Sequence, residues 1–130
     1  KILKIMEQKD IIIKNEYPIW IKFLHPDYLE RTSKIAGKWV YHDRPDKLAI
    51  KAQDFILLIV EDLTRQIKYR PTLNNPNGPF RSFLPPLCVY SEPENKDQLY
   101  ERIIQYDLQN VYWQSNEDTR ELHKRIRQSK

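Results

Sequence analysis

The stretch that decides the fold is residues 37–71, which read GKWVYHDRPDKLAIKAQDFILLIVEDLTRQIKYRP. It predicts a strand, a turn, a long helix and a second strand. The helix is expected over 46–65, because apolar residues recur there at steps of three and four and so share one face. That face consists of Leu48, Ala52, Phe55, Ile59 and Leu63, widened by Ile56 and Val60. A face this wide is typical of a helix that lies across a sheet.

The segments around this stretch predict an α+β domain. Asp43 is expected to cap the central helix, and Pro45 suits its first turn. Strands are predicted over 17–24, 38–42, 67–70, 87–91 and 110–115, and further helices over 28–36, over 95–108 and from Asp118 onward. The simplest arrangement is a curved mixed or antiparallel sheet with helices on one face. Residues 1–16 show no clear period, so we expect a poorly specified lead-in followed by one domain over 17–130.

Composition and charge narrow the class of protein. The chain has 130 residues, of which 40% are hydrophobic and 12% aromatic, enough for one folded core. The net charge of +4 resides in residues 119–130, which hold five of the 22 Lys and Arg residues and one of the 18 acids. The rest of the chain is neutral, so a uniformly basic nucleic-acid coat is excluded. The basic segment is either a solvated helix end or a contact for an anionic partner.

Several kinds of site and location are disfavoured. The longest apolar run, 55–60, is too short to span a bilayer, so no membrane association is expected. A single cysteine, Cys88, suits a reducing compartment, and we expect a cytoplasmic protein. His25, His42 and His123 lie far apart in the sequence, so we expect no metal and no cofactor. Cys88 is expected as a buried strand residue, with a Cys88–His42 nucleophilic pair as the alternative.

An aromatic and basic sheet face remains as the expected site. Strand alternation places Trp20 and Lys22 on one face of their strand. Lys68 and Arg70 lie two apart, so they emerge together about 7 Å apart. Alternation alone leaves open which face of 38–42 is free. Flat rings beside cations suit a ligand that has a ring and phosphates, whereas solvated surface residues are the plain alternative.

The segment 71–86 carries five prolines and no period. A loop this long is often functional, so we expect a flap beside the site, with Arg81 as a phosphate contact. The alternative is a spacer packed on Phe80 and Phe83. The complete expected ligand-binding set is Trp20, Lys22, Lys38, Trp39, Lys68, Arg70 and Arg81.

Four motifs carry a family resemblance. They are Gly37-Lys38-Trp39, Lys68 after the helix, Cys88-Val89-Tyr90-Ser91, and Asp118-Thr119. Over residues 17–120 the chain resembles the basophilic leukemia-expressed protein family, whose prokaryotic members carry the label phosphothreonine lyase domain protein. The resemblance implies the fold of the cap-binding translation initiation factor, with helices on the convex side of a curved sheet. In that factor the concave face stacks a methylated guanine between two tryptophans.

Three functions follow as hypotheses. The first is a binding module, without catalysis, for a nucleotide or a phosphorylated RNA end. The second, which the lyase label implies, is an enzyme that eliminates or transfers phosphate through a Lys base and a His acid. The local pairs for it are Lys38 with His42 and Lys22 with His25. The third is a domain that binds a protein partner through its helical face or the 71–86 loop.

Overall fold

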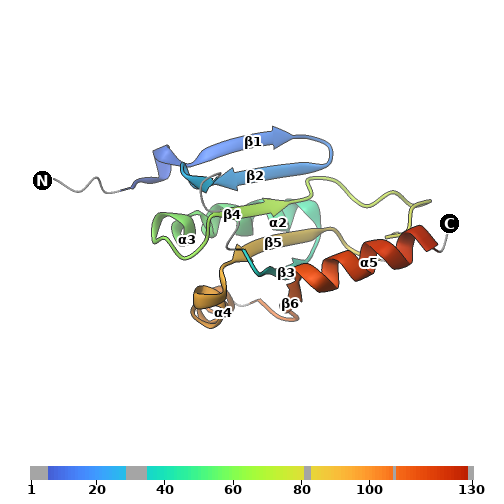
Figure 1. Ribbon diagram of the computed structural model, residues 1–130. Coiled ribbons are helices and arrows are strands. Elements are labelled where there is room, and N and C mark those ends of the chain that lie inside the picture. Colours follow the sequence, from blue (N-terminus) through green and yellow to red (C-terminus); the bar gives the residue numbers. More distant parts are fainter. Residues whose placement is uncertain (1–5, 29–34, 81–82, 107, 129–130) are drawn as a thin grey trace, which may run out of the picture.

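The computed structural model describes residues 6–28, 35–80, 83–106 and 108–128 (Figure 1). Within these ranges, six antiparallel strands form one open sheet in the order β1-β2-β4-β5-β3-β6. The strands are β1 (Ile12–Glu16), β2 (Trp20–Leu24), β3 (Gly37–His42), β4 (Gln66–Tyr69), β5 (Pro86–Ser91) and β6 (Tyr112–Ser115). The helices are α2 (Pro45–Asp54), α3 (Ile56–Val60), α4 (Lys96–Ile104) and α5 (Asn116–Gln128), with short 3-10 turns η1 (Gln8–Asp10) and η3 (Pro93–Asn95). The α+β class is confirmed, and every pairing in the sheet is antiparallel.

The predicted apolar face of the central helix forms the core. All seven of its members except Val60 are buried, and Val60 packs against them. Burying each large member contributes roughly 1.5–3 kcal/mol, so this segment supplies much of the stability. Leu99 and Ile103 of α4 join the same cluster. The layer of α2, α3 and α4 therefore covers one face of the sheet.

The central helix is shorter than the predicted 46–65 and is interrupted. A turn at Phe55 separates α2 from α3. The second helix ends because Asp62 adopts a left-handed φ of 65°. The backbone N–H of Leu63 then donates to the carbonyl of Leu58 at 2.9 Å, which completes a Schellman-type ending. The apolar spacing continues past the end of α3, so the sequence pattern predicted a longer helix than the structure shows.

The predicted cap of the central helix is wrong. Arg44 occupies the N-cap position of α2, and its side chain makes no capping hydrogen bond. Asp43 instead accepts hydrogen bonds from the hydroxyl of Tyr41 at 2.5 Å and from the backbone N–H of Arg44 at 2.8 Å. Pro45 does lie at the start of the helix, as expected.

The N-terminal segment contributes a strand that the sequence did not predict. Residues 12–16, within the expected lead-in, form β1 and pair with β2 at the edge of the sheet. Ile12 and Ile13 are both exposed, so an edge strand shows no alternation of buried and exposed positions. The helix expected over 28–36 falls mostly on residues outside the described ranges.

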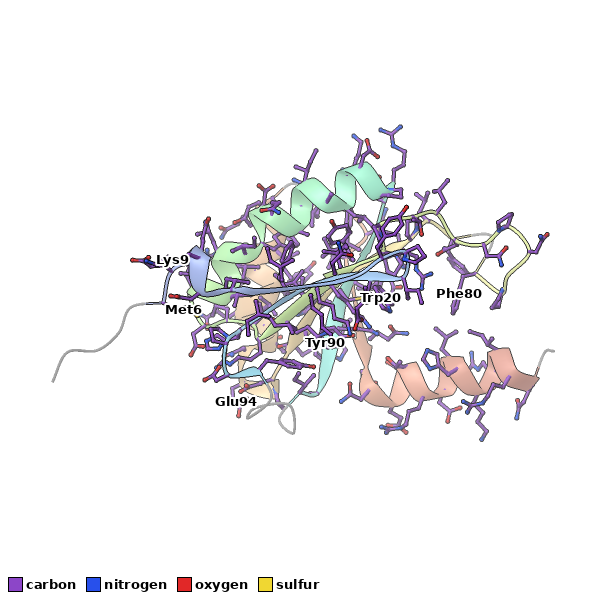
Figure 2. All side chains as sticks on the ribbon, turned by 90° about the horizontal axis from the view of Figure 1, so that it is seen from above. Met6, Lys9, Trp20, Phe80, Tyr90 and Glu94 are labelled. Carbon is purple, nitrogen blue, oxygen red and sulfur yellow. The ribbon has the colours of Figure 1, made fainter. Side chains whose placement is uncertain are left out.

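The last helix departs from the expectation that helices cover one face. Figure 2 shows α2 on one side of the sheet and α5 on the other. A reciprocal capping pair fixes the start of α5. The N–H of Asp118 donates to Ser115 Oγ at 3.0 Å, and the N–H of Ser115 donates to Asp118 Oδ2 at 3.3 Å. No described residue of α5 is buried. Among the described helices, none combines the length and apolar character that crossing a membrane requires.

A tight contact at Gly37 holds β6, and hence α5, against the sheet. A Cβ at this position would lie 2.6 Å from the carbonyl oxygen of Gln114 and 2.7 Å from Cζ2 of Trp113. Gly37→Ala should therefore lower the free energy of unfolding by about 1–3 kcal/mol in a denaturant titration. The control is Gly78→Ala, whose nearest neighbour belongs to an exposed loop side chain at 3.3 Å and whose effect should stay within about 1 kcal/mol. Equal effects of the two substitutions would contradict this account of the contact.

Candidate functional site

The strand registers place all even-numbered side chains of β2 to β6 on the side of the sheet away from α2. Lys22 pairs with Lys68, Lys68 with Cys88, and Lys38 with Tyr90. We call this side the open face. Successive strand residues alternate between faces, so the odd-numbered neighbours pack toward the helices. Figure 2 shows Trp20 and Tyr90 on the side of the sheet where α5 lies.

A cavity of about 480 Å³ lies over the open face. Its floor includes Trp20, Lys38, Lys68 and Tyr90 from four strands, and Arg70, which directly follows β4. Asn74, Phe80, Phe83 and Leu84 of the 71–86 loop form one wall of the cavity. Thr119, Leu122 and His123 of α5 form another. Among the described residues that line the cavity there is no Asp or Glu. The cavity is therefore cationic and aromatic.

Lys68 is the most perturbed basic group in this cavity. Its Nζ lies 4.0 Å from the centroid of the Trp20 ring and 5.6 Å from that of Tyr90. Burial, together with the charges of Lys38, Lys22 and Arg70, lowers the pKa of Lys68 to about 8. A Cys88 thiolate would oppose this change, but burial raises the pKa of that thiol and keeps it neutral at pH 7.

The cations of the floor have no acceptor in the described part of the chain. Lys38, Lys68 and Arg70 make no side-chain hydrogen bond or ion pair with any described residue. The Arg70 guanidinium carbon lies 5.0 Å from the Trp20 ring, and its Nε is buried without a hydrogen-bond partner among those residues. Buried donors in proteins are normally satisfied, so these groups offer unused donors to an anion that enters the cavity.

The structure brings together four of the seven expected site residues. Trp20, Lys38, Lys68 and Arg70 all line the cavity. Lys22 shares the open face but pairs with Glu16, its Nζ lying 2.8 Å from Oε1. Arg81 lies outside the described residues.

Trp39 does not belong to this set. The open alternative for strand 38–42 is resolved in favour of Lys38, because Trp39 is odd-numbered and packs toward the helices. Its Nε1 donates to the carbonyl of Lys96 at 3.0 Å, and its ring contacts Tyr100 and Trp113. Trp39 therefore does not line the cavity with the other expected residues.

His42 connects the loop wall of the cavity to strand β6. Its Nδ1 lies 2.7 Å from the carbonyl oxygen of Leu84, and its Nε2 lies 2.7 Å from the hydroxyl of Tyr112. A carbonyl only accepts, so Nδ1 carries a proton, and in the neutral ring Nε2 accepts from the hydroxyl of Tyr112. Its ring also stacks on that of Tyr112 at 5.7 Å. Both nitrogens are thus engaged.

These contacts bear on the catalytic alternatives. A Cys88–His42 nucleophilic pair is disfavoured, because His42 is fully hydrogen-bonded and the pKa of the buried thiol is raised. His25 lies outside the cavity beside Asp27 and Asp62, so it does not meet Lys22 there. Among the described residues, no three His, Cys, Asp or Glu side chains gather as a metal site requires.

Sequence reasoning missed Tyr90, Tyr112 and His123 as cavity residues. Tyr90 had a usable signal, since it lies two residues after Cys88 on one strand and must share its face. His123 had none, because its position depends on where α5 packs. The 71–86 loop lies beside the site as expected, in the cavity wall, where Figure 2 shows Phe80 between the loop and α5. Its role as a flap stays a prediction. The side chain of Asn74 fastens this loop by donating to the carbonyls of Phe80 and Phe83.

Comparisons with known proteins identify no relative of this chain, so only the geometry of the site indicates what it binds. The sequence matches no protein-family model and no curated protein, and the fold matches no solved structure. What the fold and cavity define is a class of site: a cationic, aromatic cavity on the open face of an α+β sheet.

A charged Lys68 that has no anionic partner should reduce the free energy of unfolding of the ligand-free protein. Lys68→Met should raise the free energy of unfolding at pH 7, because it removes a desolvated charge that three other cations repel. A pKa lowered from 10.5 to about 8 corresponds to at most about 3 kcal/mol. Partial solvent access reduces this, so we expect a gain of about 1–2 kcal/mol in urea titration.

The pH dependence checks the cause of this gain. Folded Lys68 loses its proton near pH 8, whereas the unfolded chain keeps it up to about 10.5. The unfolded state binds more protons in this window, so wild-type stability rises with pH relative to the variant and the gain shrinks. Lys22→Met is the control and should bring no gain, because Lys22 is paired with Glu16. A destabilised Lys68→Met protein at pH 7 would contradict the account.

Proposed function

We propose that this protein binds a nucleotide or the phosphorylated end of an RNA in the cavity, without turning it over. The observation that carries the proposal is the convergence of Lys38, Lys68 and Arg70, unpaired among described residues, on a cavity whose described lining holds no carboxylate. Phosphate oxygens accept charge-assisted hydrogen bonds from such groups, about 1.5–3 kcal/mol each.

The size and the aromatic lining support a ligand that carries a ring. A volume of about 480 Å³ falls in the range of small-molecule sites. Trp20, Tyr90, Tyr112 and Phe83 offer ring faces on which a base can stack. Phosphate and base would then be held by different parts of one cavity.

The surface of α5 supports an RNA end over a free nucleotide. Arg120, Lys124 and Arg127 follow one another at helical spacing and are exposed. Thr119 and His123, their neighbours in the sequence, line the cavity. Phosphates that follow a terminal nucleotide would therefore meet further positive charge.

We also propose that the chain belongs to the basophilic leukemia-expressed protein family and that its fold resembles that of the cap-binding factor. Lys38, Lys68, Cys88 and Tyr90, which carry part of the resemblance, all line the cavity. A cytoplasmic location is supported by the single, buried cysteine.

One observation favours a second function. Lys68, with a pKa of about 8, lines the same cavity as His123. A Lys base and a His acid suit elimination or transfer of phosphate. Release of inorganic phosphate or a dehydrated product from a phosphopeptide, lost in Lys68→Arg, would favour the enzyme over the binding module.

The proposed function is tested by the pH dependence of binding. Affinity for adenosine diphosphate, read by tryptophan fluorescence, should fall by about tenfold between pH 7.5 and 9.5, because Lys68 loses the proton that contacts phosphate. Lys68→Arg should keep its affinity across this range, since arginine stays charged. Trp20→Phe identifies the reporting tryptophan. If nucleotides and short 5′-phosphorylated RNAs all fail to bind, the protein-interaction hypothesis takes the place of this proposal.

A further inference from the structure

We propose that Lys68 is a nucleophilic amine that captures phosphorylated aldehydes as a Schiff base. The inference rests on the proposed anion-binding function, because the phosphate must hold the ligand while the amine reacts. The ligand class is a compact molecule that carries an aldehyde, a phosphate and preferably a flat ring. Capture is reversible and adds a covalent step to a site that would otherwise only bind.

The geometry distinguishes Lys68 from other lysines of the chain. Lys22 pairs with Glu16, and Lys51 donates to the carbonyl of Tyr106 at 2.9 Å. Lys68 has no such partner among the described residues, and its amino group lies over the Trp20 ring inside the cavity. An amine in an apolar pocket beside other cations is a known way to activate lysine.

The charged and titratable groups around Lys68 include cations that lower its pKa, and a thiol and two phenols whose own pKa values are raised by burial. They come from every element that borders the cavity: Lys22, Lys38, His42, Arg70, Cys88, Tyr90, Tyr112 and His123. None of these is a carboxylate that would hold the proton on Lys68. With a pKa of about 8, roughly a quarter of the amine is neutral at pH 7.5, against about one part in a thousand for an ordinary lysine.

The reaction needs no oxidant or metal. The lone pair of neutral Nζ attacks the carbonyl carbon, a C–N bond forms, and the carbonyl oxygen takes a proton to give a carbinolamine. Loss of one water molecule, with the remaining amine proton, leaves the imine. Lys38 and Arg70 hold the phosphate, while the rings of Trp20 and Tyr90 exclude water and face the ring of the ligand.

The probe is pyridoxal 5′-phosphate, which joins an aldehyde, a phosphate and a ring. The full chain is mixed with one equivalent at pH 7.5, then sodium borohydride supplies the hydride that converts the imine to a stable secondary amine. Peptide mass mapping should find most of the adduct on Lys68. Lys68→Arg and Lys68→Met should lose this adduct, and Lys22→Arg should keep it. Pyridoxal without phosphate should label Lys68 at least tenfold less.

A second ligand separates failure of this inference from failure of the anion site. Pyridoxine 5′-phosphate has an alcohol in place of the aldehyde, so it reports phosphate binding alone. If it binds and pyridoxal 5′-phosphate labels exposed lysines no less than Lys68, the inference is overturned while the anion site stands. If it does not bind and Lys68 is not labelled, both are overturned. Equal labelling of Lys68 with and without phosphate would overturn the role of phosphate in the capture.

Discussion

Replacing Lys68 and Arg70 together by glutamate is expected to weaken nucleotide binding by roughly 3–6 kcal/mol. Each side chain is expected to lose one charge-assisted contact of about 1.5–3 kcal/mol. Little loss of fold stability is expected, because neither side chain belongs to the hydrophobic core and neither is held by a described acceptor. Isothermal titration of both proteins with adenosine diphosphate and a 5′-phosphorylated RNA measures the difference.

The matched control keeps the same change in net charge away from the cavity. Lys9 and Lys47 are exposed and do not line it, so Lys9→Glu/Lys47→Glu should bind almost as well as the wild type. Wild-type affinity should also fall with rising salt along a shallow slope, since only two to four phosphates are engaged. Equal losses in the two double variants would mean that net charge, not the cavity, governs binding.

Phe55→Ala is expected to lower the free energy of unfolding by about 3–5 kcal/mol. Phe55 is fully buried at the turn between α2 and α3, and its ring packs against Tyr106 with centroids 5.0 Å apart. Removing the ring leaves a cavity that the surrounding helices and strands cannot close. Denaturant unfolding followed by circular dichroism gives the loss directly.

Leu57→Ala serves as the matched control in the next helix. Leu57 is 44% exposed, so its truncation should cost less than about 1 kcal/mol. If Phe55→Ala were no worse than Leu57→Ala, the packing of the central helices across the sheet would be contradicted.

The apolar core and the placement of Lys68 and Arg70 on one face of the sheet could be predicted from the sequence, because each depends on a local period. Phe55 and Leu48 recur at helical spacing, and strand alternation places Lys68 and Arg70 together. Those relations hold whatever the rest of the chain does. The left-handed turn at Asp62 leaves no mark in apolar spacing, so the end of the helix was misplaced.

Features that depend on contacts between distant segments could not be predicted from local spacing. Strand 38–42 offers Trp39 on one face and Lys38 on the other, and only the sheet register shows which one meets Lys68. The side of the sheet that α5 covers was equally open, because Leu122 and Ile126 are its only strong apolar anchors. Because the position of α5 was unknown, the sequence could predict a basic face but not a cavity with walls.

A crystal structure grown with a nucleoside diphosphate tests the central claim most directly. We expect the phosphates on the open face, with oxygens within about 3.2 Å of Lys68 Nζ and the Arg70 guanidinium, and the base against the aromatic side chains of the cavity. A nucleotide bound on the helical face, or a cavity left empty at saturating ligand, would contradict it.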